Sequence, residues 1–341
     1  MSAAAVWARL VGRVPWLGWV GRWGVSLCSL ALGVLTLFVF RRGLPHVGWI
    51  VGYLLLLWAL FTLMTELRAS FEQGGRRLVL TASDYAIQTL YHNLLLFVLP
   101  AYYASATLSS PNALFVAGVA AAALVTAVDP WYRRLVHPRP WLSDLLLGFS
   151  MFAALNVALG LVGVRPILAL EGSSILAVVA LTPAFRRHGG VGWKRAHVRA
   201  AILAVAAAVL VWYGRALIPP APLFLARAVA ARTVTMMEPV DIVERGRVSA
   251  DTVAAWGELA AYTAVYAPSG LRQPIQHIWR RDGELLAVIP LPTPVQGGRA
   301  EGFRTHSRRR DLRPPLAGRY TVDVVTASGQ LIGRLKFTVT P

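Results

Sequence analysis

The chain has 341 residues, with 34 Lys and Arg against 16 Asp and Glu, and a formal net charge of +18. Apolar residues make up 56% of it, charged residues only 15%, and the mean hydropathy is +0.55. Soluble domains are about one quarter charged, so this composition excludes a chain built only of water-soluble domains and predicts a membrane protein. The one cysteine, Cys28, lies in an apolar run, which excludes an internal disulfide and a cysteine-based metal site.

The first 24 residues, "MSAAAVWARLVGRVPWLGWVGRWG", interleave tryptophan with arginine. Tryptophan favours the headgroup level of a bilayer, and arginine favours anionic lipid. The pattern therefore predicts an interfacial N-terminal segment over residues 1–24. A cleaved signal peptide is the alternative, although no small-x-small cleavage site clearly follows the first apolar run.

Seven apolar stretches follow, and a helix needs about 17–25 such residues to cross a bilayer. They occupy approximately residues 23–40, 47–64, 85–108, 113–128, 142–163, 167–185 and 200–214. Short connections between apolar helices favour antiparallel neighbours, so we expect a compact transmembrane bundle over residues 25–219.

The loops between these stretches differ in basic residues, which predicts their side of the membrane. With a cytoplasmic N-terminus, the inner segments hold fourteen Lys and Arg, and the outer loops hold three, namely Arg41, Arg42 and Arg165. Seven spans then place the C-terminal region outside, in the periplasm of a bacterial inner membrane. This expectation depends on the span count, because one helix fewer would put the region in the cytoplasm.

The pattern changes after Pro222, where apolar residues alternate with polar ones. "LIGRLKFTV" puts Leu331 and Phe337 on one face and Arg334 and Lys336 on the other, the period of a half-buried strand. "RYTVDVV" alternates in the same way, and Asp282-Gly283 and Ser328-Gly329 are turn signals. We expect an α+β chain in which a linker and lead-in with a short helix (220–256) precede an antiparallel immunoglobulin-like β-sandwich (257–341). No internal repeat at a fixed period is evident.

One candidate site lies in the third apolar stretch, "SDYAIQTLYHNLLLFVLP". Asp84, Gln88 and His92 recur every four residues and share a helix face, with Asn93 beside it. Polar groups at membrane depth mark ion, proton or substrate paths, but they also hydrogen-bond to neighbouring helices. Both interpretations stay open here.

A second candidate is Glu171, several residues inside the sixth stretch. An acid there requires a partner or a proton, and Arg165, Arg215 and Asn156 are within reach along the sequence. Glu171 therefore either pins helices through an arginine or forms a proton or substrate site that opens to the outside.

The third candidate is the arginine-rich stretch 297–320 together with the "HIWRR" strand. Cations interleaved with aromatic rings bind anionic or carbohydrate ligands as readily as single-stranded nucleic acid. Trp279 is alternatively a core tryptophan, and the arginines are alternatively a solvated or membrane-facing rim. The candidate ligand or partner surface comprises His277, Trp279, Arg299, Phe303, Arg304, Arg308, Arg309 and Arg310.

These C-terminal residues carry a resemblance. His277-x-Trp279, the run from Gly297 to Arg304, Gly318-x-Tyr320-x-Val322-Asp323-Val324 and the run from Gly329 to Arg334 are similar to an uncharacterised bacterial family of multi-pass membrane proteins with a C-terminal domain of unknown function. "YHNLLLFVLPAYYASATL" and "VDPWYRRL" resemble its helical region. Tyr320 stands where members often have tryptophan. The resemblance implies this architecture and carries no activity.

The leading hypothesis is non-enzymatic: the β domain binds a periplasmic partner or an anionic envelope ligand, and the bundle anchors it in the lipid bilayer. The alternative is a transporter or membrane-embedded enzyme that acts on a lipid-linked substrate through the polar residues of the bundle. Nucleic-acid binding requires a cytoplasmic basic strip and is not expected. No catalytic motif, cofactor or metal is expected from the sequence.

Overall fold

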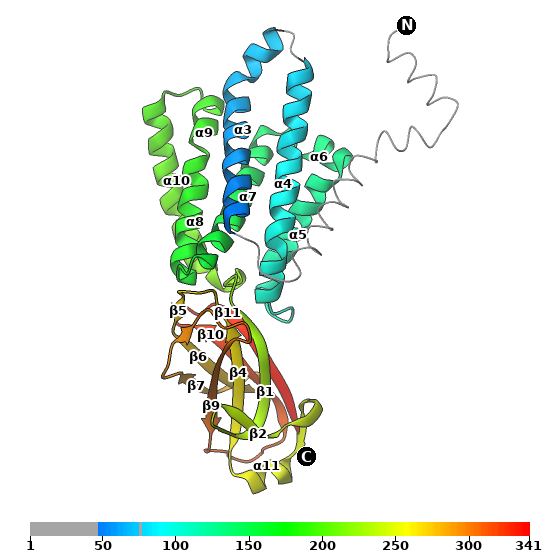
Figure 1. Ribbon diagram of the computed structural model, residues 1–341, viewed down its shortest axis with the longest axis vertical. Coiled ribbons are helices and arrows are strands. Elements are labelled where there is room, and N and C mark those ends of the chain that lie inside the picture. Colours follow the sequence, from blue (N-terminus) through cyan, green and yellow to red (C-terminus); the bar gives the residue numbers. More distant parts are fainter. Residues whose placement is uncertain (1–46, 75–76) are drawn as a thin grey trace, which may run out of the picture. The chain divides into compact units, whose positions relative to one another are not determined.

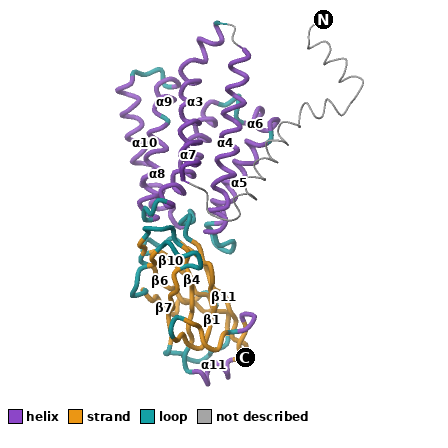
Figure 2. Tube along the Cα trace, viewed as in Figure 1, coloured by secondary structure: helices purple, strands orange, loops and turns teal. Residues whose placement is uncertain are grey.

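The computed structural model describes residues 47–74 and 77–341. The predicted interfacial segment 1–24, Cys28 and the first predicted span therefore lie outside the described residues. Helices occupy the described chain up to residue 217, and strands begin at residue 224 (Figures 1 and 2). The predicted α+β class is confirmed, with the helical and β parts in the predicted order.

Eight α-helices precede the first strand in the described residues. They are α3 (Val47–Gln73), α4 (Arg77–Ser105), α5 (Ala113–Ala127), α6 (Asp129–Leu135), α7 (Pro140–Leu161), α8 (Pro166–Ala180), α9 (Thr182–His188) and α10 (Trp193–Gly214). They follow the six later apolar stretches of the sequence, and α6 and α9 are short continuations of the fourth and sixth.

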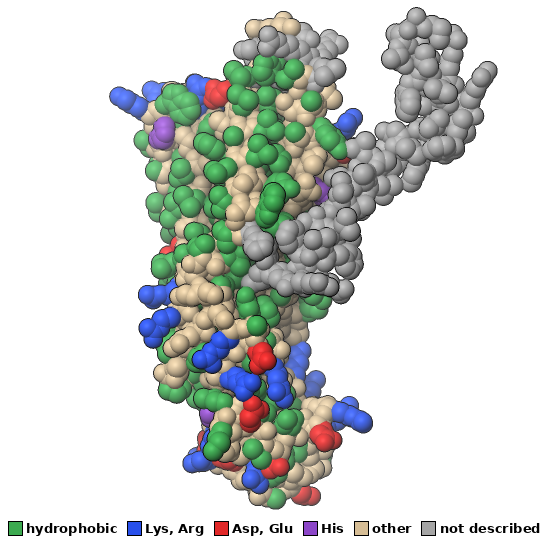
Figure 3. All heavy atoms as spheres, in the orientation of Figure 1, with side chains coloured by type: hydrophobic (Ala, Val, Ile, Leu, Met, Phe, Trp, Pro, Cys, Tyr) green, Lys and Arg blue, Asp and Glu red, His purple; other side chains and the backbone are tan. Residues whose placement is uncertain are grey.

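Four segments of the described chain are long and apolar enough to cross a membrane: Val47–Leu67, Pro140–Leu161, Pro166–His188 and Trp193–Leu217. A fifth is obtained if α5 and α6, which are bent by 101° at Val128, form one broken span. Exposed apolar side chains cover the helices, as Leu210 (72% exposed) on α10 illustrates (Figure 3). Helices of this kind fit an integral membrane protein. The count of seven spans stays a prediction.

The chain divides into two compact units. The first contains the described residues up to Pro100 with Ala117–Leu155 and Ser173–Ala207, and the second contains Ala101–Val116, Asn156–Gly172 and Ala208–Pro341. The second unit therefore combines the β domain with the helix ends around three connections.

Eleven strands build the β domain. They are β1 (Phe224–Thr235), β2 (Glu238–Ile242), β3 (Arg247–Ser249), β4 (Leu259–Tyr266), β5 (Arg272–Gln273), β6 (Ile275–Arg281), β7 (Glu284–Pro290), β8 (Val295–Gln296), β9 (Phe303–Arg309), β10 (Gly318–Thr326) and β11 (Leu331–Thr340). The predicted lead-in, 220–256, thus holds three strands. It also holds the expected short helix, α11 (Ala250–Trp256), whose first turn is capped by the Ser249 hydroxyl accepting from the Thr252 amide.

The main strands form two sheets with the orders β2-β1-β4-β9 and β3-β11-β10-β6-β7, and β5 pairs with β8 separately. All of these pairs are antiparallel except β3 with β11. Residues of both large sheets share one core: Leu259 and Ala261 from the first pack with Trp279, Val322 and Phe337 from the second. The two sheets therefore face each other.

The predicted turns and alternation are found in the second sheet. Asp282 and Gly283 both have positive φ, at 49° and 92°, and join β6 to β7 as a two-residue hairpin requires. In β11 the expected face is buried, and Lys336 on the other face is exposed. Asp323 of β10 is 5% exposed and accepts hydrogen bonds from Arg280 at 2.7 Å and from Arg334. Two arginines thus compensate the burial of this carboxylate.

Within the second unit, the turn between β10 and β11 bonds to the helix connections. Arg215 Nε donates to the Ser328 carbonyl oxygen at 2.6 Å, and the Gln330 amide donates to the Ile218 carbonyl oxygen at 3.4 Å. Asn112 donates to the Leu331 carbonyl oxygen at 3.4 Å, and Arg334 donates to that of Ser109 at 3.3 Å. The connections 105–113 and 214–224 are therefore anchored to the same β turn.

Candidate functional site

The predicted helix face on α4 is present, and its polar side chains bond to neighbouring segments of the first unit. Gln88 is 6% exposed and donates to the Thr126 carbonyl oxygen at 2.9 Å and to Asp129 Oδ1 at 2.6 Å. His92 is 1% exposed, with Nδ1 at 3.5 Å from the Ala123 carbonyl oxygen. The hydrogen-bonding interpretation of this face accounts for both contacts.

Asp84, at the start of this face, lies 3.3 Å from His137 Nε2 in an ion pair that joins α4 to the segment after α6. Asn93 is half-buried and lies one residue around the helix from His92, off the shared face. Glu171 is half-buried and belongs to the second unit. Among its expected partners, Arg215 donates to the Ser328 and Trp212 carbonyl oxygens, and Asn156 donates to the Tyr102 hydroxyl.

Two of the predicted surface residues lie in the interior of the β domain. His277 and Trp279, on β6, are both 0% exposed. His277 Nε2 lies 3.1 Å from the Thr263 hydroxyl and Nδ1 lies 2.8 Å from the Ser307 hydroxyl, which also accepts from Trp279 Nε1 at 2.9 Å. This buried network joins β4, β6 and β9, so the core interpretation of Trp279 holds, and neither side chain contributes to an exposed surface.

The His277 imidazole is neutral in this network near pH 7. Burial, and secondarily the nearby His306, lower the pKa of His277 from its ordinary 6.5 to about 4. Which ring nitrogen carries the hydrogen depends on the hydroxyl orientations of Thr263 and Ser307, and each hydroxyl can donate or accept. The network is thus a structural polar core that requires an uncharged histidine.

The arginines of β9 alternate in direction, as the strand period requires. Arg309 is 8% exposed and is paired with Asp311 at 3.1 Å. Arg304 pairs with Glu238 at 2.7 Å and with Glu301 at 3.3 Å, and Arg310 pairs with Glu258 at 3.1 Å. Arg308 donates to the Val234 carbonyl oxygen. Much of the predicted basic strip therefore bonds within the domain, which supports a structural role for Arg309 and Arg310.

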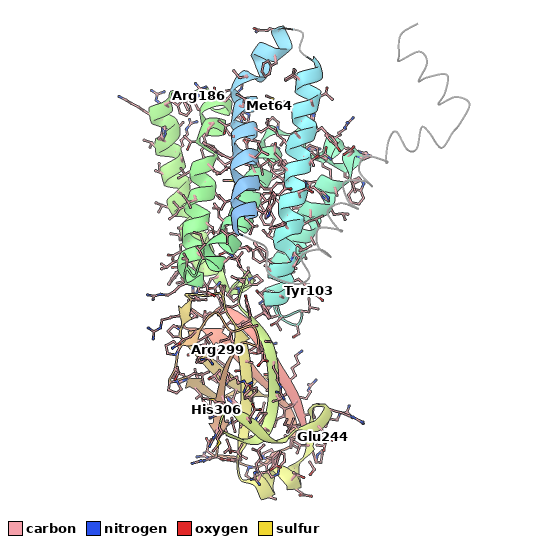
Figure 4. The ribbon with its side chains drawn as sticks, viewed as in Figure 1. Met64, Tyr103, Arg186, Glu244, Arg299 and His306 are labelled. Carbon is pink, nitrogen blue, oxygen red and sulfur yellow. The ribbon has the colours of Figure 1, made fainter. Side chains whose placement is uncertain are left out.

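The loop before β9 holds the remaining predicted residues. The guanidinium carbon of Arg299 stacks 5.1 Å from the Phe303 ring centroid, and Phe303 itself is 9% exposed (Figure 4). A Cβ at Gly297 would lie 1.6 Å from the Pro268 carbonyl oxygen, so only glycine fits that close approach. The Gly-Gly-Arg motif therefore fixes the backbone and leaves Arg299 exposed.

Strand register brings further residues to the outer face of the sheet β2-β1-β4-β9. Tyr262 of β4 stands opposite Val229 of β1 and His306 of β9, and Ala264 stands between Arg227 and Arg304. We call Arg227, Arg304, His306 and Arg308 the basic face. Tyr262, between them, is itself buried, at 1% exposed.

Charge on the basic face is only partly neutralised. The Arg227 guanidinium lies 5.7 Å from the Tyr262 ring centroid, a cation–π distance. Tyr262 and the paired glutamates raise the pKa of the Arg304 guanidinium. Arg227 and Arg308 form no salt bridge among the described residues. His306 Nδ1 is buried and accepts or donates no hydrogen bond in the described part of the chain. The exposed guanidinium groups of Arg227 and Arg308 thus carry charge that no carboxylate of the described residues neutralises in a salt bridge.

Comparison with protein families decides the identity. Residues 6–260 match a family described as "Family of unknown function (DUF5924)" and residues 272–339 match "Protein of unknown function (DUF2914)". The chain belongs to the first of these families. No curated protein and no solved structure matches the chain.

The boundary between the two family matches falls inside the β domain. The DUF5924 match contains β1 to β3 and the start of β4, and the DUF2914 match contains β5 to β10 and all of β11 except its last residue. β9 belongs to the DUF2914 match and pairs with β4, which begins in the DUF5924 match. Each match therefore holds part of the same two-sheet core. The basic face is likewise assembled from both matched regions.

Sequence reasoning missed Arg227, Tyr262 and His306. His306 was detectable, because it alternates with Arg304 and Arg308 in "RTHSRR". Arg227 and Tyr262 had no local signal, since their place depends on the register of β1 and β4 against β9. No group of three or more His, Cys, Asp or Glu that could hold a metal ion occurs among the described residues.

Proposed function

We propose that this protein is a multi-pass bacterial inner-membrane protein whose periplasmic β domain binds an anionic envelope ligand on the basic face. The observation that carries the proposal is the strand register that gathers Arg227, Arg304, His306 and Arg308 around Tyr262. Guanidinium groups recognise sulfate, phosphate and carboxylate groups. An acidic periplasmic protein is the alternative occupant.

The distribution of basic residues among the loops supports a periplasmic location of the β domain, and this argument does not depend on the number of spans. α10 leads directly into the β domain, and its other end carries Lys194, Arg195 and Arg199. The connections 105–113 and 161–166, which lie in the same unit as the β domain, carry one basic residue, Arg165. Because basic loops stay in the cytoplasm, the β domain belongs on the opposite side. A C-terminal fusion to an enzyme active only in the periplasm tests this, and an inactive, stably expressed fusion contradicts it.

We also infer that the β domain is of the immunoglobulin-like type. Its sheet orders support this. In the letters used for immunoglobulin strands, β1-β4-β9 of the first sheet corresponds to A-B-E, with β2 added at the edge, and β3-β11-β10-β6-β7 corresponds to A′-G-F-C-C′. Trp279 occupies the buried core position on the C-like strand. Tyr320, near the start of β10, donates its hydroxyl to the Leu316 carbonyl oxygen at 2.9 Å, as in a tyrosine corner.

The binding proposal is tested on the full chain in nanodiscs of zwitterionic lipid, with fluorescent dextran sulfate as the anionic probe and uncharged dextran as its control. We expect Arg227→Gln with Arg308→Gln to weaken binding of the sulfated polymer by about tenfold, because each lost charge contact is worth about 0.5–1 kcal/mol or more.

The matched control, Arg272→Gln with Arg313→Gln, removes the same amount of charge from two exposed positions outside the basic face. We expect it to weaken binding less than twofold. Equal losses of dextran sulfate binding in the two double variants would show that the polymer responds to net charge alone. This result would contradict a binding site on the basic face. A wild-type chain that fails to retain the sulfated polymer would contradict the function itself.

A further inference from the structure

The helical part contains two segments with the same order of elements. In the first, α4 is followed by the 15-residue α5 and the 7-residue α6, and in the second, α7 is followed by the 15-residue α8 and the 7-residue α9. The junctions are similar in sequence: "VTAVDPWYRRL" ends at Leu135 and "VVALTPAFRRH" ends at His188. Both short helices begin with a proline in the first turn and carry two consecutive arginines.

An ion pair closes each segment. Ser83-Asp84 in α4 and Ser143-Asp144 in α7 are the corresponding dipeptides, and Asp84 pairs with His137 at 3.3 Å while Asp144 pairs with His188 at 2.9 Å. The spacing between matching positions is 60 residues at the Ser-Asp pairs and 53 at the Arg-Arg pairs. This difference explains why no repeat of fixed period is evident in the sequence.

The two arginine pairs differ in what neutralises them. In the second segment, Arg186 is bound by the Glu66 carboxylate of α3, and Arg187 donates to the Glu66 carbonyl oxygen at 2.7 Å (Figure 4). In the first segment, Arg133 and Arg134 are exposed and form no salt bridge within the described chain. Residues 1–46 contain no Asp or Glu that could take the place of Glu66.

The surroundings of α6 fit the surface of a bilayer. α6 is turned 101° from α5, so a membrane-crossing α5 leaves α6 along the membrane surface. Tyr132 is buried, whereas Trp131 is 46% exposed beside the two arginines. Tryptophan and arginine together favour the headgroup level, and unpaired arginines are excluded from the hydrocarbon by their charge. Arg139 is engaged with the carbonyl oxygens of Arg134 and Leu135 and closes the C-terminal end of α6.

We propose that Arg133 and Arg134 bind the phosphate of an anionic lipid headgroup, which takes the place that the Glu66 carboxylate occupies beside Arg186. Each guanidinium group supplies several donors to a phosphate, and the anionic lipids of the cytoplasmic leaflet attract clustered arginines. The shared chemistry is a phosphate monoanion, and either a lipid or free inorganic phosphate could supply it.

The test counts bound lipid on the full chain by native mass spectrometry after incubation with phosphatidylglycerol, with phosphatidylcholine, which is zwitterionic and has no net charge, as the comparison. We expect Arg133→Gln with Arg134→Gln to lower retention of phosphatidylglycerol by about 25-fold, since each arginine near an anionic surface contributes about a fivefold change. The control, Lys194→Gln with Arg195→Gln, removes the same charge at the start of α10 and is expected to change retention less than twofold.

Equal losses in both double variants, or no loss in either, would overturn the site. Inorganic phosphate at about 10 mM is added in a second arm, and full displacement of phosphatidylglycerol by it would overturn the lipid source. A third variant tests the equivalence of the segments: Glu66→Gln removes the carboxylate from Arg186 and leaves the bond of Arg187 to the backbone carbonyl oxygen in place. The folded variant is therefore expected to retain one further phosphatidylglycerol through Arg186. An unchanged lipid count in that variant would contradict the comparison with Glu66.

Discussion

The two faces of the sheet β2-β1-β4-β9 differ although the same strands supply both. On the inner face, Thr263 and Ser307 satisfy His277 and Trp279 of the opposing sheet, and every polar group of this network is paired. On the outer face, Arg308, the residue after Ser307, is exposed, and neither it nor Arg227 forms a salt bridge within the described chain. Alternation along β4 and β9 thus separates a structural network from a candidate binding surface.

This difference assigns stability to one face and ligand capture to the other. Substitutions of inner residues should lower the free energy of unfolding of the β domain, and they should affect binding only through unfolding. Substitutions of Arg227 and Arg308 should do the reverse, because exposed positions usually change stability by less than about 0.5 kcal/mol.

The largest expected effect is the loss of stability of the β domain in acid, which arises from protonation of His277 in the inner network. The pKa of His277 is about 4 in the folded chain and ordinarily 6.5 when unfolded, so below pH 6.5 the unfolded state binds more protons. Stability present above pH 6.5 is therefore lost as the pH falls toward 4, by about 3 kcal/mol in total. The unfolding temperature of the β domain, measured in the detergent-solubilised full chain across this range, reports the loss.

His277→Gln removes the titrating group and should flatten this part of the pH profile, at a lower starting stability. His197→Gln, at an exposed histidine of α10, is the matched control and should keep the wild-type profile. The same slope in wild type and His277→Gln would show that other groups cause the acid sensitivity.

Ser307→Ala should have the next largest effect. The hydroxyl of Ser307 is the shared partner of His277 Nδ1 and Trp279 Nε1, so its loss leaves two buried groups without a hydrogen bond. We expect a cost of about 1–3 kcal/mol in the free energy of unfolding, measured by chemical denaturation of the full chain. Ser269→Ala, at an exposed serine, should be neutral, and an equal effect of the two changes would contradict the role of the network.

Much of the β domain was predictable because its signals are local. Asp282-Gly283 determines a hairpin from two residues, and alternation in β10 and β11 separates buried Val322 and Phe337 from exposed Lys336. β1 was not predicted because "FLARAVAARTVT" is rich in alanine, which has weak strand preference. It becomes a strand through pairing with β2 and β4, and such pairing cannot be read from the residues of β1 alone.

The candidate sites show the same limit. Helical spacing correctly put Gln88 and His92 on one face of α4, but their partners Thr126, Asp129 and Ala123 come from another helix and the start of the next. Arg227 lies on β1, and it shares a sheet face with residues of β9 only because β1 and β9 both pair with β4. Local periodicity gives the direction of a side chain, whereas its neighbour is determined by tertiary packing.

The smallest expected effect concerns His306 on the outer face. Burial, and then the charge of Arg308, lower the pKa of His306 below its ordinary 6.5, so its imidazole is neutral at pH 7. A bound anion would favour the charged imidazole, so binding of dextran sulfate should strengthen by about two- to threefold from pH 7.5 to 5.5.

This rise should be absent in His306→Gln, which keeps a polar side chain but cannot gain a proton, and it should persist in His197→Gln. Acid also weakens the inner network through His277, so each binding measurement must be made below the unfolding temperature at that pH. The two histidines then act in opposite directions: protonation of His277 lowers the folded fraction, and protonation of His306 raises the affinity of what remains folded. A rise of the same size in His306→Gln would assign the pH dependence to another group and remove His306 from the basic face.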